Sequence, residues 1–283
     1  MDTPDYQIRT MTRGEVDIAI DWAAAEGWNP GLHDADCFYA ADPDGFLIGL
    51  LNGEPIAVIS VVKYGEHFGF LGFYIVKPEY RGQGYGLQIW NAGLAYLDGQ
   101  TIGLDGVVAQ QGNYRKSGFS LANGNLRYQG VGGAAPVADS ALVPLSALPF
   151  ADLCAYDQAL FPERRSTFLR HWIDQPESTA LGILQEHRLA GYAVLRKCRD
   201  GYKIGPLFAD SPELAERLFL ALRARVPAGR ALFLDTPANN AAAVALAQRH
   251  GMSMVFETAR MYRGPVPQID GQRIFGVTSF ELG

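Results

Sequence analysis

The sequence predicts an α/β (α+β) protein made of two lobes. Its 283 residues correspond to two domains of roughly 150 residues each. Apolar strand-like runs alternate with helical patterns over residues 68–129, and the order strand, helix, strand, helix, strand returns in the second half. A segment rich in Gly, Ala and Pro, residues 130–140, separates the halves. We therefore expect lobes at 1–132 and 142–283 joined by a linker at 133–141, each a mixed, mostly antiparallel sheet flanked by helices.

The elements of the first half follow from hydrophobic spacing and turn residues. Val16 and Ile20 lie at helical spacing, and Gly27 ends that helix. Asn52-Gly53 supplies the tight turn of a hairpin, and a polar, turn-rich stretch precedes the hairpin. The predicted elements are strand 6–11, helix 13–26, strands 46–51, 55–64 and 68–76, helix 87–97, strand 102–108, helix 113–117 and strand 126–129, which closes the lobe.

The second half repeats this logic with different residues. The spacing of its apolar residues again separates helices from strands, and Gly251 ends the last helix. The predicted elements are helices 152–160 and 165–173, strands 180–185, 190–197 and 203–208, helix 212–224, strand 231–234, helix 240–250, strand 255–261 and one more strand within 273–282.

The composition is that of an ordinary globular protein, with 48% hydrophobic and 19% charged residues, which excludes a disordered chain or a coiled coil. Cys37, Cys154 and Cys198 are far apart and form no CxxC pair, so we expect core packing rather than disulfides or a zinc site. The first residues include two acids, and no run approaches the roughly 18 apolar residues of a membrane span. We expect a cytoplasmic protein without a membrane partner or a metal.

The net charge of −6 argues against a nucleic-acid partner. The charge is unevenly distributed, because residues 1–70 hold twelve acidic and three basic residues, a balance of −9, and the remainder carries +3. Such a cluster either forms a solvated acidic face or attracts a cationic substrate such as an amine.

A glycine-rich segment lies between a predicted strand and a predicted helix. Gly82, Gly84 and Gly86 leave helix N-terminal amides without partners and without obstructing side chains, so the turn can cradle a diphosphate, and Arg81 adds a positive charge. The alternative is a loop that lets strand and helix meet at close quarters. A Walker loop is excluded because no Lys-Ser or Lys-Thr closes the segment, and a Rossmann fingerprint is excluded because Ile89 takes the place of the third glycine.

Two motifs resemble those of a known family. Residues 73–86, FYIVKPEYRGQGYG, are similar to the acetyl-CoA signature of the GNAT superfamily of N-acetyltransferases: a strand, a V-x-P-x-[YF] bend, then [RQ]-x-x-G-x-[GA] and a helix. Residues 114–119, YRKSGF, resemble the family's Y-x-K-x-G-F and follow the next strand at the expected distance. The resemblance covers residues 5–130 and implies a splayed sheet in each lobe.

The resemblance implies acetyl-CoA as a cosubstrate. The loop amides would hold the diphosphate, the edge of the preceding strand would meet the pantetheine arm, and one strand N–H would polarise the thioester carbonyl. The family often has an Asn where this chain has Val107, and Asn113 is the candidate replacement. The implied cofactor-binding residues are Tyr74, Ile75, Val76, Arg81, Gly82, Gln83, Gly84, Tyr85, Gly86 and Asn113.

The same resemblance gives Tyr114 the role of general acid, which protonates the departing CoA thiolate. For the general base we consider Glu66 with its neighbour His67, and Asp105 on the splayed neighbouring strand. Each has a structural alternative: the first two as solvated turn residues, and Asp105 as an acceptor for backbone or helix N–H groups. Three further residues complete the expectations: His33 and Asp34 shape the substrate pocket, and the chain-end carboxylate of Gly283 is a further candidate base.

The second lobe lacks the functional residues of the first. Residues 232–252 resemble the family's strand and N-x-x-A-x-x-L helix, but Ala247 occupies the tyrosine position. The segment 203–212, KIGPLFADSP, has no glycine cradle before its helix. We expect this lobe to bind no acetyl-CoA and to wall the acceptor site.

Together these features predict an N-acetyltransferase that moves an acetyl group from acetyl-CoA to a small amine or amino-acid-like acceptor by direct attack in a ternary complex. The alternative is a non-catalytic acyl-CoA-binding sensor. The presence of Tyr114, the candidate general acid, argues against it. A third interpretation keeps the chemistry with a longer acyl-CoA as donor. The expected partners are small molecules, and an oligomer is compatible with the sequence.

Overall fold

The computed structural model describes residues 5–135 and 138–283. Its first half is close to the predicted pattern, with one additional helix, α2. The elements are β1 (Tyr6–Thr10), α1 (Arg13–Ala25), α2 (Asp34–Ala41), β2 (Phe46–Leu51), β3 (Glu54–Tyr64), β4 (Phe68–Val76), α3 (Tyr85–Tyr96), β5 (Thr101–Val107), α4 (Gln111–Lys116) and β6 (Ser120–Val131).

The second half also follows the prediction, with one additional short strand, β7. Its last predicted strand is wrong beyond Gly276, because the chain there leaves the sheet and packs between the lobes. The elements are β7 (Leu142–Pro144), α5 (Phe150–Gln158), α6 (Ser166–Asp174), β8 (Ser178–Gln185), β9 (Arg188–Lys197), β10 (Tyr202–Ala209), α7 (Pro212–Arg223), β11 (Ala231–Pro237), α8 (Ala241–Arg249), β12 (Ser253–Arg263) and β13 (Ile274–Gly276).

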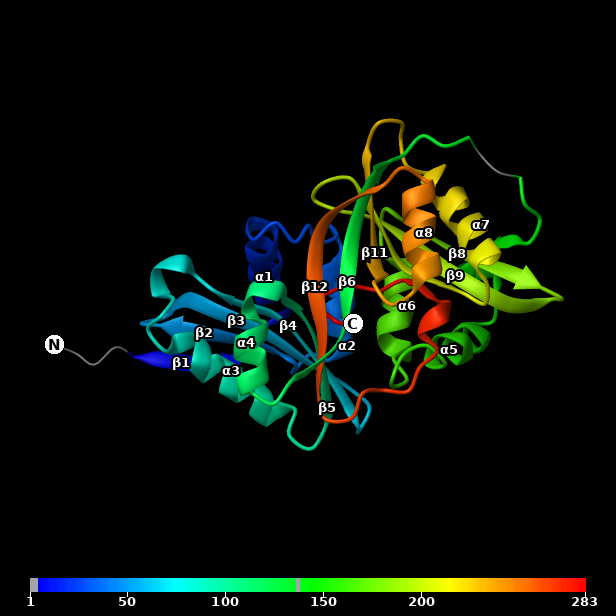
Figure 1. Ribbon diagram of the computed structural model, residues 1–283. Helices are drawn as coiled ribbons and strands as arrows, with labels where there is room; N and C mark the ends of the chain where they lie inside the picture. Colours follow the sequence, from blue (N-terminus) through cyan, green and yellow to red (C-terminus); the bar gives the residue numbers. More distant parts are fainter. Residues whose placement is uncertain (1–4, 136–137) are drawn as a thin grey trace.

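The strands form one continuous sheet across both lobes, in the order β1-β2-β3-β4-β5-β12-β6-β11-β10-β9-β8-β7, with β13 beside β10. The lobes exchange a strand: β12 pairs with β5, while β6 pairs with β11 and β12 (Figure 1). The prediction that residues 126–129 close the first lobe is therefore wrong, because β6 lies in the second lobe's part of the sheet. The linker expected at 133–141 contains residues 136 and 137, which lie outside the described residues.

Helices cover the faces of this sheet. Helices α3 and α4 pack on one face of the first lobe, and a second apolar core contains residues of α7 and α8. The largest core unites α1, α2, α5 and α6 and so lies between the lobes. The stretch predicted as polar turns contains α2, whose Phe38 is fully buried and stacks on Trp172 of α6 with ring centroids 5.8 Å apart. The acid-rich sequence of α2 conceals its apolar face, and that face supplies much of the contact between the lobes.

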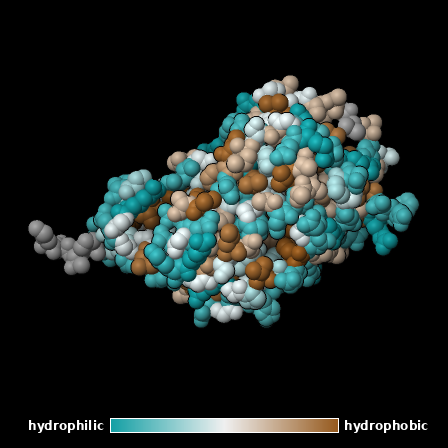
Figure 2. All heavy atoms as spheres, in the orientation of Figure 1, coloured by the Kyte–Doolittle hydropathy of each residue, from teal (hydrophilic) through white to brown (hydrophobic). Residues whose placement is uncertain are grey.

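The surface is mixed, with hydrophobic residues interspersed among hydrophilic ones over the face shown in Figure 2. Cys37, Cys154 and Cys198 are buried and unpaired, as predicted. Within residues 5–135 and 138–283, no helix has the length and apolar character needed to span a bilayer. In the same ranges, no group of three or more His, Cys, Asp or Glu side chains is placed to hold a metal ion.

Candidate active site

Strands β4 and β5 run parallel and separate halfway along their length. Their pairing extends from Phe68 opposite Thr101 to Leu71 opposite Leu104 and then stops. Beyond that point a cavity of about 530 Å³ opens between them, within the range of small-molecule sites. The cavity is lined by the free halves of both strands, by the glycine loop and by residues of the second lobe. The splay implied by the family resemblance is therefore present in the first lobe.

The open edge of β4 presents backbone groups to this cavity. Lys77 N donates to Ile56 O on β3 (2.9 Å). Because the N–H and C=O groups of successive residues point to alternate sides of a strand, the peptide groups of Tyr74 and Val76 face the open side. Ile75 directs its peptide groups to β3 and still lines the cavity. A bulge with Phe73 at φ 46° precedes these residues, and it turns the strand away from β5.

The glycine loop at the start of α3 has the geometry of an anion cradle. Gly82 and Gly84 have φ values of 75° and 88°, a region that other residues rarely adopt. At Gly86 a Cβ would lie 2.7 Å from the hydroxyl of Tyr74, so close packing is the reason for that glycine. No side chain caps the helix, and its first-turn amides have no intrahelical acceptor. All three glycines line the cavity, so the backbone fits a diphosphate group.

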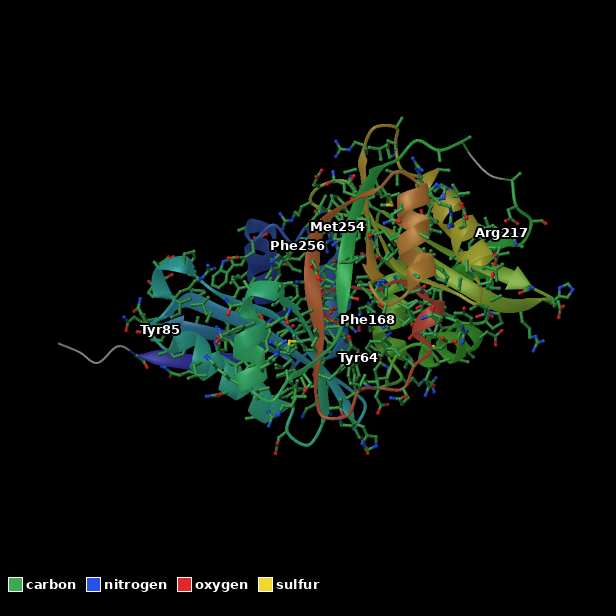
Figure 3. The ribbon with its side chains drawn as sticks, in the orientation of Figure 1. Tyr64, Tyr85, Phe168, Arg217, Met254 and Phe256 are labelled. Atoms are coloured by element: carbon green, nitrogen blue, oxygen red, sulfur yellow. The ribbon has the colours of Figure 1, made fainter. Side chains whose placement is uncertain are left out.

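The remaining predicted cofactor contacts divide into two groups. Arg81 lines the cavity, donates from Nε to Val76 O (2.8 Å) and pairs with Glu26 at its mouth. Gln83, Tyr85 and Asn113 do not line the cavity. Gln83 Nε2 donates to Glu79 O (2.8 Å) and so braces the loop. Tyr85, labelled in Figure 3, packs on Tyr6 at 4.8 Å, whereas Asn113 is exposed and bonds to Gln110. The expectation that Asn113 faces the cofactor has no support in this arrangement, because α4 turns it to solvent.

Tyr114 of α4 lines the same cavity as the loop. Its ring stacks on Trp90 (centroids 5.6 Å apart), and a Cβ on Gly106 would lie 2.1 Å from that ring, so the missing side chain makes room for it. No residue within 5–135 or 138–283 forms a hydrogen bond with its hydroxyl, which is therefore free for a ligand. Burial and the nearby Tyr74 raise the pKa of Tyr114 to about 12, so the phenol carries a proton at neutral pH.

The two carboxylates predicted as bases have different positions. Asp105 lines the cavity, but it accepts Nε of Arg260 (2.8 Å), Nη2 of Arg260 (2.5 Å) and Nδ2 of Asn125 (2.8 Å). Burial raises the pKa of Asp105, and the Arg260 guanidinium opposes that rise. Its oxygens are thus already used, as in the structural alternative. Glu66 and His67 are exposed in the turn before β4, at the opposite end of that strand from the cavity, so the geometric basis for either as a base is lost.

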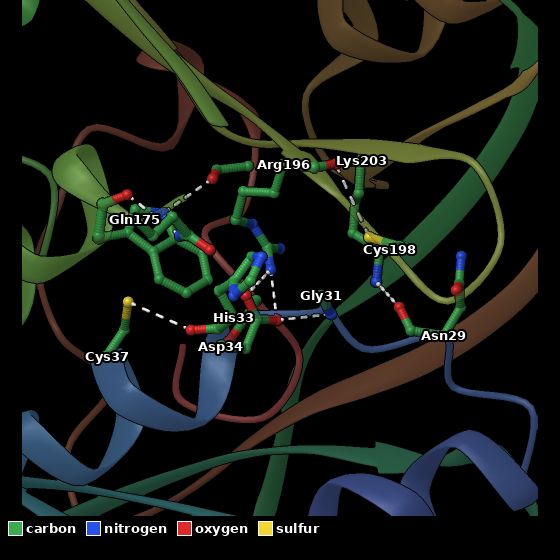
Figure 4. Close-up of polar contacts among 12 residues, drawn as sticks. Asn29, Gly31, His33, Asp34, Cys37, Gln175, Arg196, Cys198 and Lys203 are labelled. Atoms are coloured by element: carbon green, nitrogen blue, oxygen red, sulfur yellow. Dashed lines mark hydrogen bonds and ion pairs between the residues drawn. The ribbon is translucent and has the colours of Figure 1, made fainter. Parts of the chain in front are cut away.

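The other predicted pocket residues also lie outside the cavity. Asp34 is buried and forms an ion pair with Arg196 of β9 (Figure 4), while His33 approaches Glu177 at 3.4 Å. This cluster joins α2 to the second lobe and does not line the cavity. Gly283 packs against Phe70 and Phe161 and does not line the cavity either.

Sequence reasoning missed several lining residues, among them Trp28, Phe256, Thr258, Phe280 and Glu281. Phe256 belongs to β12, the strand exchanged from the second lobe, and is labelled in Figure 3. Phe280 and Glu281 belong to residues 274–283, which we call the tail. The available signal was a single acidic residue in an otherwise uncharged, largely apolar run, IFGVTSFEL.

The second lobe contains the equivalent opening, but its own chain fills it. Strands β10 and β11 run parallel only from Tyr202 to Ile204, and β13 then pairs with β10 at Leu207 and Phe208. Ser211 caps α7 by accepting the amide of Leu214. At this opening the second lobe therefore offers a nucleotide neither a free edge of β10 nor an uncapped α7.

Comparison with known proteins agrees with this geometry. Residues 15–119 match the model of the acetyltransferase (GNAT) family, and residues 153–276 match that of an acetyltransferase (GNAT) domain. The chain is 32% identical over 269 residues to holothin acyltransferase from Pseudoalteromonas sp., covering 95% of this chain and 92% of that protein. It is also 28% identical to the uncharacterized N-acetyltransferase YitH of Bacillus subtilis, over 62% of each chain.

Two solved structures share the whole fold. A candidate acetyltransferase from Pyrococcus horikoshii superposes with a TM-score of 0.84 at 22% identity, covering 100% of this chain and 98% of that one. A tandem GNAT protein from the clavulanic acid biosynthesis pathway gives a TM-score of 0.63 at 11% identity, covering 93% and 100%. At these identities the likeness concerns the fold alone.

The fold and the family matches define the class: the chain belongs to the GNAT acetyltransferase family. Within the family it is a tandem member, with one GNAT region in each half, and it is an acyltransferase enzyme.

Proposed function

We propose that this enzyme transfers the acetyl group of acetyl-CoA to a small amine by direct attack in a ternary complex. The observation that carries the proposal is a single cavity lined by the glycine cradle, the free edge of β4 and Tyr114. In this arrangement the loop amides hold the diphosphate, and Tyr74 and Val76 meet the pantetheine arm. The N–H of Tyr74 or Val76 polarises the thioester carbonyl. Tyr114 then gives its proton to the departing thiolate.

The acceptor end of the cavity supports an amine with an apolar or aromatic body. Trp28, Phe256 and Phe280 supply aromatic surface there. Among residues 5–70, Glu26 is the acidic residue that lines the cavity, and it is paired with Arg81. The acidic first quarter thus contributes little to the lining, which favours the solvated acidic face over attraction of a cationic acceptor. The name of holothin acyltransferase gives an acyl transfer to holothin, and for this chain we propose a small amine as the acceptor. Because acetyl-CoA is an intracellular metabolite, we place the reaction in the cytoplasm.

The test is thiol release from acetyl-CoA with a panel of amines: aniline, 2-aminothiazole, tryptamine and putrescine. We expect release with at least one aryl or apolar amine and little with putrescine. Repeating the assay with propionyl-, butyryl- and hexanoyl-CoA separates a longer-chain enzyme from an acetyltransferase. Tight CoA binding without thiol release for any donor and acceptor would overturn the proposal.

A further inference from the structure

Glu281 is a buried carboxylate without a partner in the wall of the cavity. Glu281 lines the same cavity as Tyr114 and the free edge of β4. The residue is 3% exposed, and its Oε1 has no hydrogen-bond partner in the described chain. A second orphaned atom, Oγ1 of Thr258, belongs to another residue that lines the cavity. Because buried polar groups are nearly always satisfied, two orphaned oxygens on residues that line one cavity point to a polar ligand there.

The tail that carries Glu281 is fixed to both lobes. Tyr64 Oη donates to Leu282 O (3.1 Å), and Leu282 N donates to Ser279 Oγ (3.0 Å). Arg165 of the second lobe donates to Thr278 Oγ1 (3.0 Å). The backbone of Glu281 packs on β4, where a Cβ at Gly72 would lie 2.1 Å from its carbonyl oxygen. The backbone that carries the carboxylate is thus anchored where β4 bulges, two residues before the strand edge that would face the thioester.

The charges that surround Glu281 are already engaged with other groups. Arg127 of β6 forms a bidentate pair with Asp235 (2.7 Å for both bonds), and Arg196 of β9 pairs with Asp34 of α2. Lys203 of β10 donates to the carbonyl of Asn29 (3.0 Å), as drawn in Figure 4. Once these two ion pairs are formed, Lys203 and Glu281 are the charged groups of this region that have no ionic partner. They make no ion pair with each other in the described chain.

This environment suits a proton acceptor. Burial raises the pKa of the Glu281 carboxyl, and the negative charge of Asp34 adds to the rise. The positive charges of Lys203, Arg127 and Arg196 oppose it. A carboxyl with a raised pKa takes up a proton more readily than an ordinary one near neutral pH, as general-base catalysis requires. Among the carboxylates that line the cavity, Asp105 and Glu26 are held by arginines, whereas Glu281 is not.

We propose that Glu281 is the general base that deprotonates the acceptor nitrogen. The neutral amine attacks the thioester carbonyl, so that a C–N bond forms and the C–S bond breaks. Glu281 receives the proton that nitrogen loses, and the thiolate takes the proton of Tyr114. Transfer of one proton from Glu281 to the Tyr114 phenolate through solvent restores both groups. An acceptor that binds as an ammonium first releases one further proton to solvent. This inference rests on the proposed function.

The experiment compares Glu281→Gln, which keeps the shape and removes the charge, with Glu66→Gln as a matched control on an exposed carboxylate. Thiol release is measured with acetyl-CoA and the best amine of the panel, CoA affinity by calorimetry, and folding by thermal melting. We expect kcat to fall by about 10² to 10³-fold in Glu281→Gln, with the CoA affinity within about threefold of wild type. The Glu66→Gln variant should match wild type in all three measurements.

The pH profile separates a base from a structural role. In wild type kcat should rise with the ionisation of Glu281, and Glu281→Gln should lose that acidic limb. Glu281→Asp, which retains the charge one methylene further back, should keep the limb at reduced kcat, and it decides the question if Glu281→Gln unfolds. Wild-type kcat or an unchanged acidic limb in Glu281→Gln would overturn the assignment while leaving the proposed function intact. No thiol release by wild type with any amine would instead overturn the proposed function, and this inference with it.

Discussion

Replacing Tyr114 by Phe isolates one oxygen atom of the active site. The ring keeps its stacking on Trp90 and its contact with Gly106, and the hydroxyl forms no hydrogen bond with a described residue. Removing it therefore leaves no buried partner unsatisfied, and the free energy of unfolding should change by less than about 0.5 kcal/mol. For a chain of this size that corresponds to a melting shift of less than about 2 °C.

The effect on catalysis should be far larger than the effect on stability. Loss of a general acid typically costs about 10² to 10⁴-fold in rate, which corresponds to about 3 to 5.5 kcal/mol of transition-state stabilisation. We expect kcat to fall by this factor in a thiol-release assay while the Kd for CoA stays constant. The pKa of about 12 has a further consequence: Tyr114 remains protonated up to about pH 11, so it should produce no alkaline limb in the wild-type profile below pH 10.

Two results would refute this reasoning. A Tyr114→Phe enzyme that retains more than about a third of the wild-type kcat would show that the thiolate leaves without this proton. A melting temperature lowered by more than about 5 °C would show that the hydroxyl has a structural partner, and the kinetic loss could then not be assigned to acid catalysis.

Three further predictions concern the cradle, the interlobe ion pairs and the tail. Gly84→Asp should weaken CoA binding at least tenfold by calorimetry, since the new carboxylate meets the diphosphate. Gly99→Asp is the matched control, because Gly99 has a similar φ of 80° and also lies in open space. It should introduce the same backbone strain and leave the CoA affinity unchanged. An equal loss of CoA affinity in both variants would contradict a diphosphate site at the loop. Burial opposes ionisation of Asp235, but the guanidinium of Arg127 prevails and holds its pKa below the ordinary value. The stability that the ion pair supplies is present at neutral pH and lost as the pH falls below about 4. The difference in melting temperature between wild type and Asp235→Asn should therefore shrink towards pH 3. A difference that stays constant with pH would show that ionisation of Asp235 does not contribute to stability. Gly72→Ala should displace the tail, because its Cβ would lie 2.1 Å from the tail's backbone, and should lower kcat more than CoA affinity; wild-type kcat would show that the tail's position is unimportant.

The residues of the cofactor cradle could be predicted from the sequence because their function is local. A glycine at positive φ, an uncapped helix and the strand before it are all encoded within residues 73–86, and their geometry depends little on the rest of the chain. Tyr114 follows at a fixed distance along the next strand and helix. The periodicity of apolar residues likewise placed nearly all helices and strands.

Tertiary structure alone decided which segments complete the site. Strand pairing uses backbone hydrogen bonds that are nearly the same for any sequence, so the exchange of β6 and β12 between the lobes leaves no local signature. The exchange brings Phe256 to the cavity, and the tail brings Glu281 there from the far end of the chain. Helix α2 has an acid-rich sequence that resembles a loop. Its apolar face is recognised as part of the core because it packs on α6 in the folded chain. A base at this site becomes visible once burial leaves one carboxylate without a partner, and burial is a property of the folded chain rather than of any short segment.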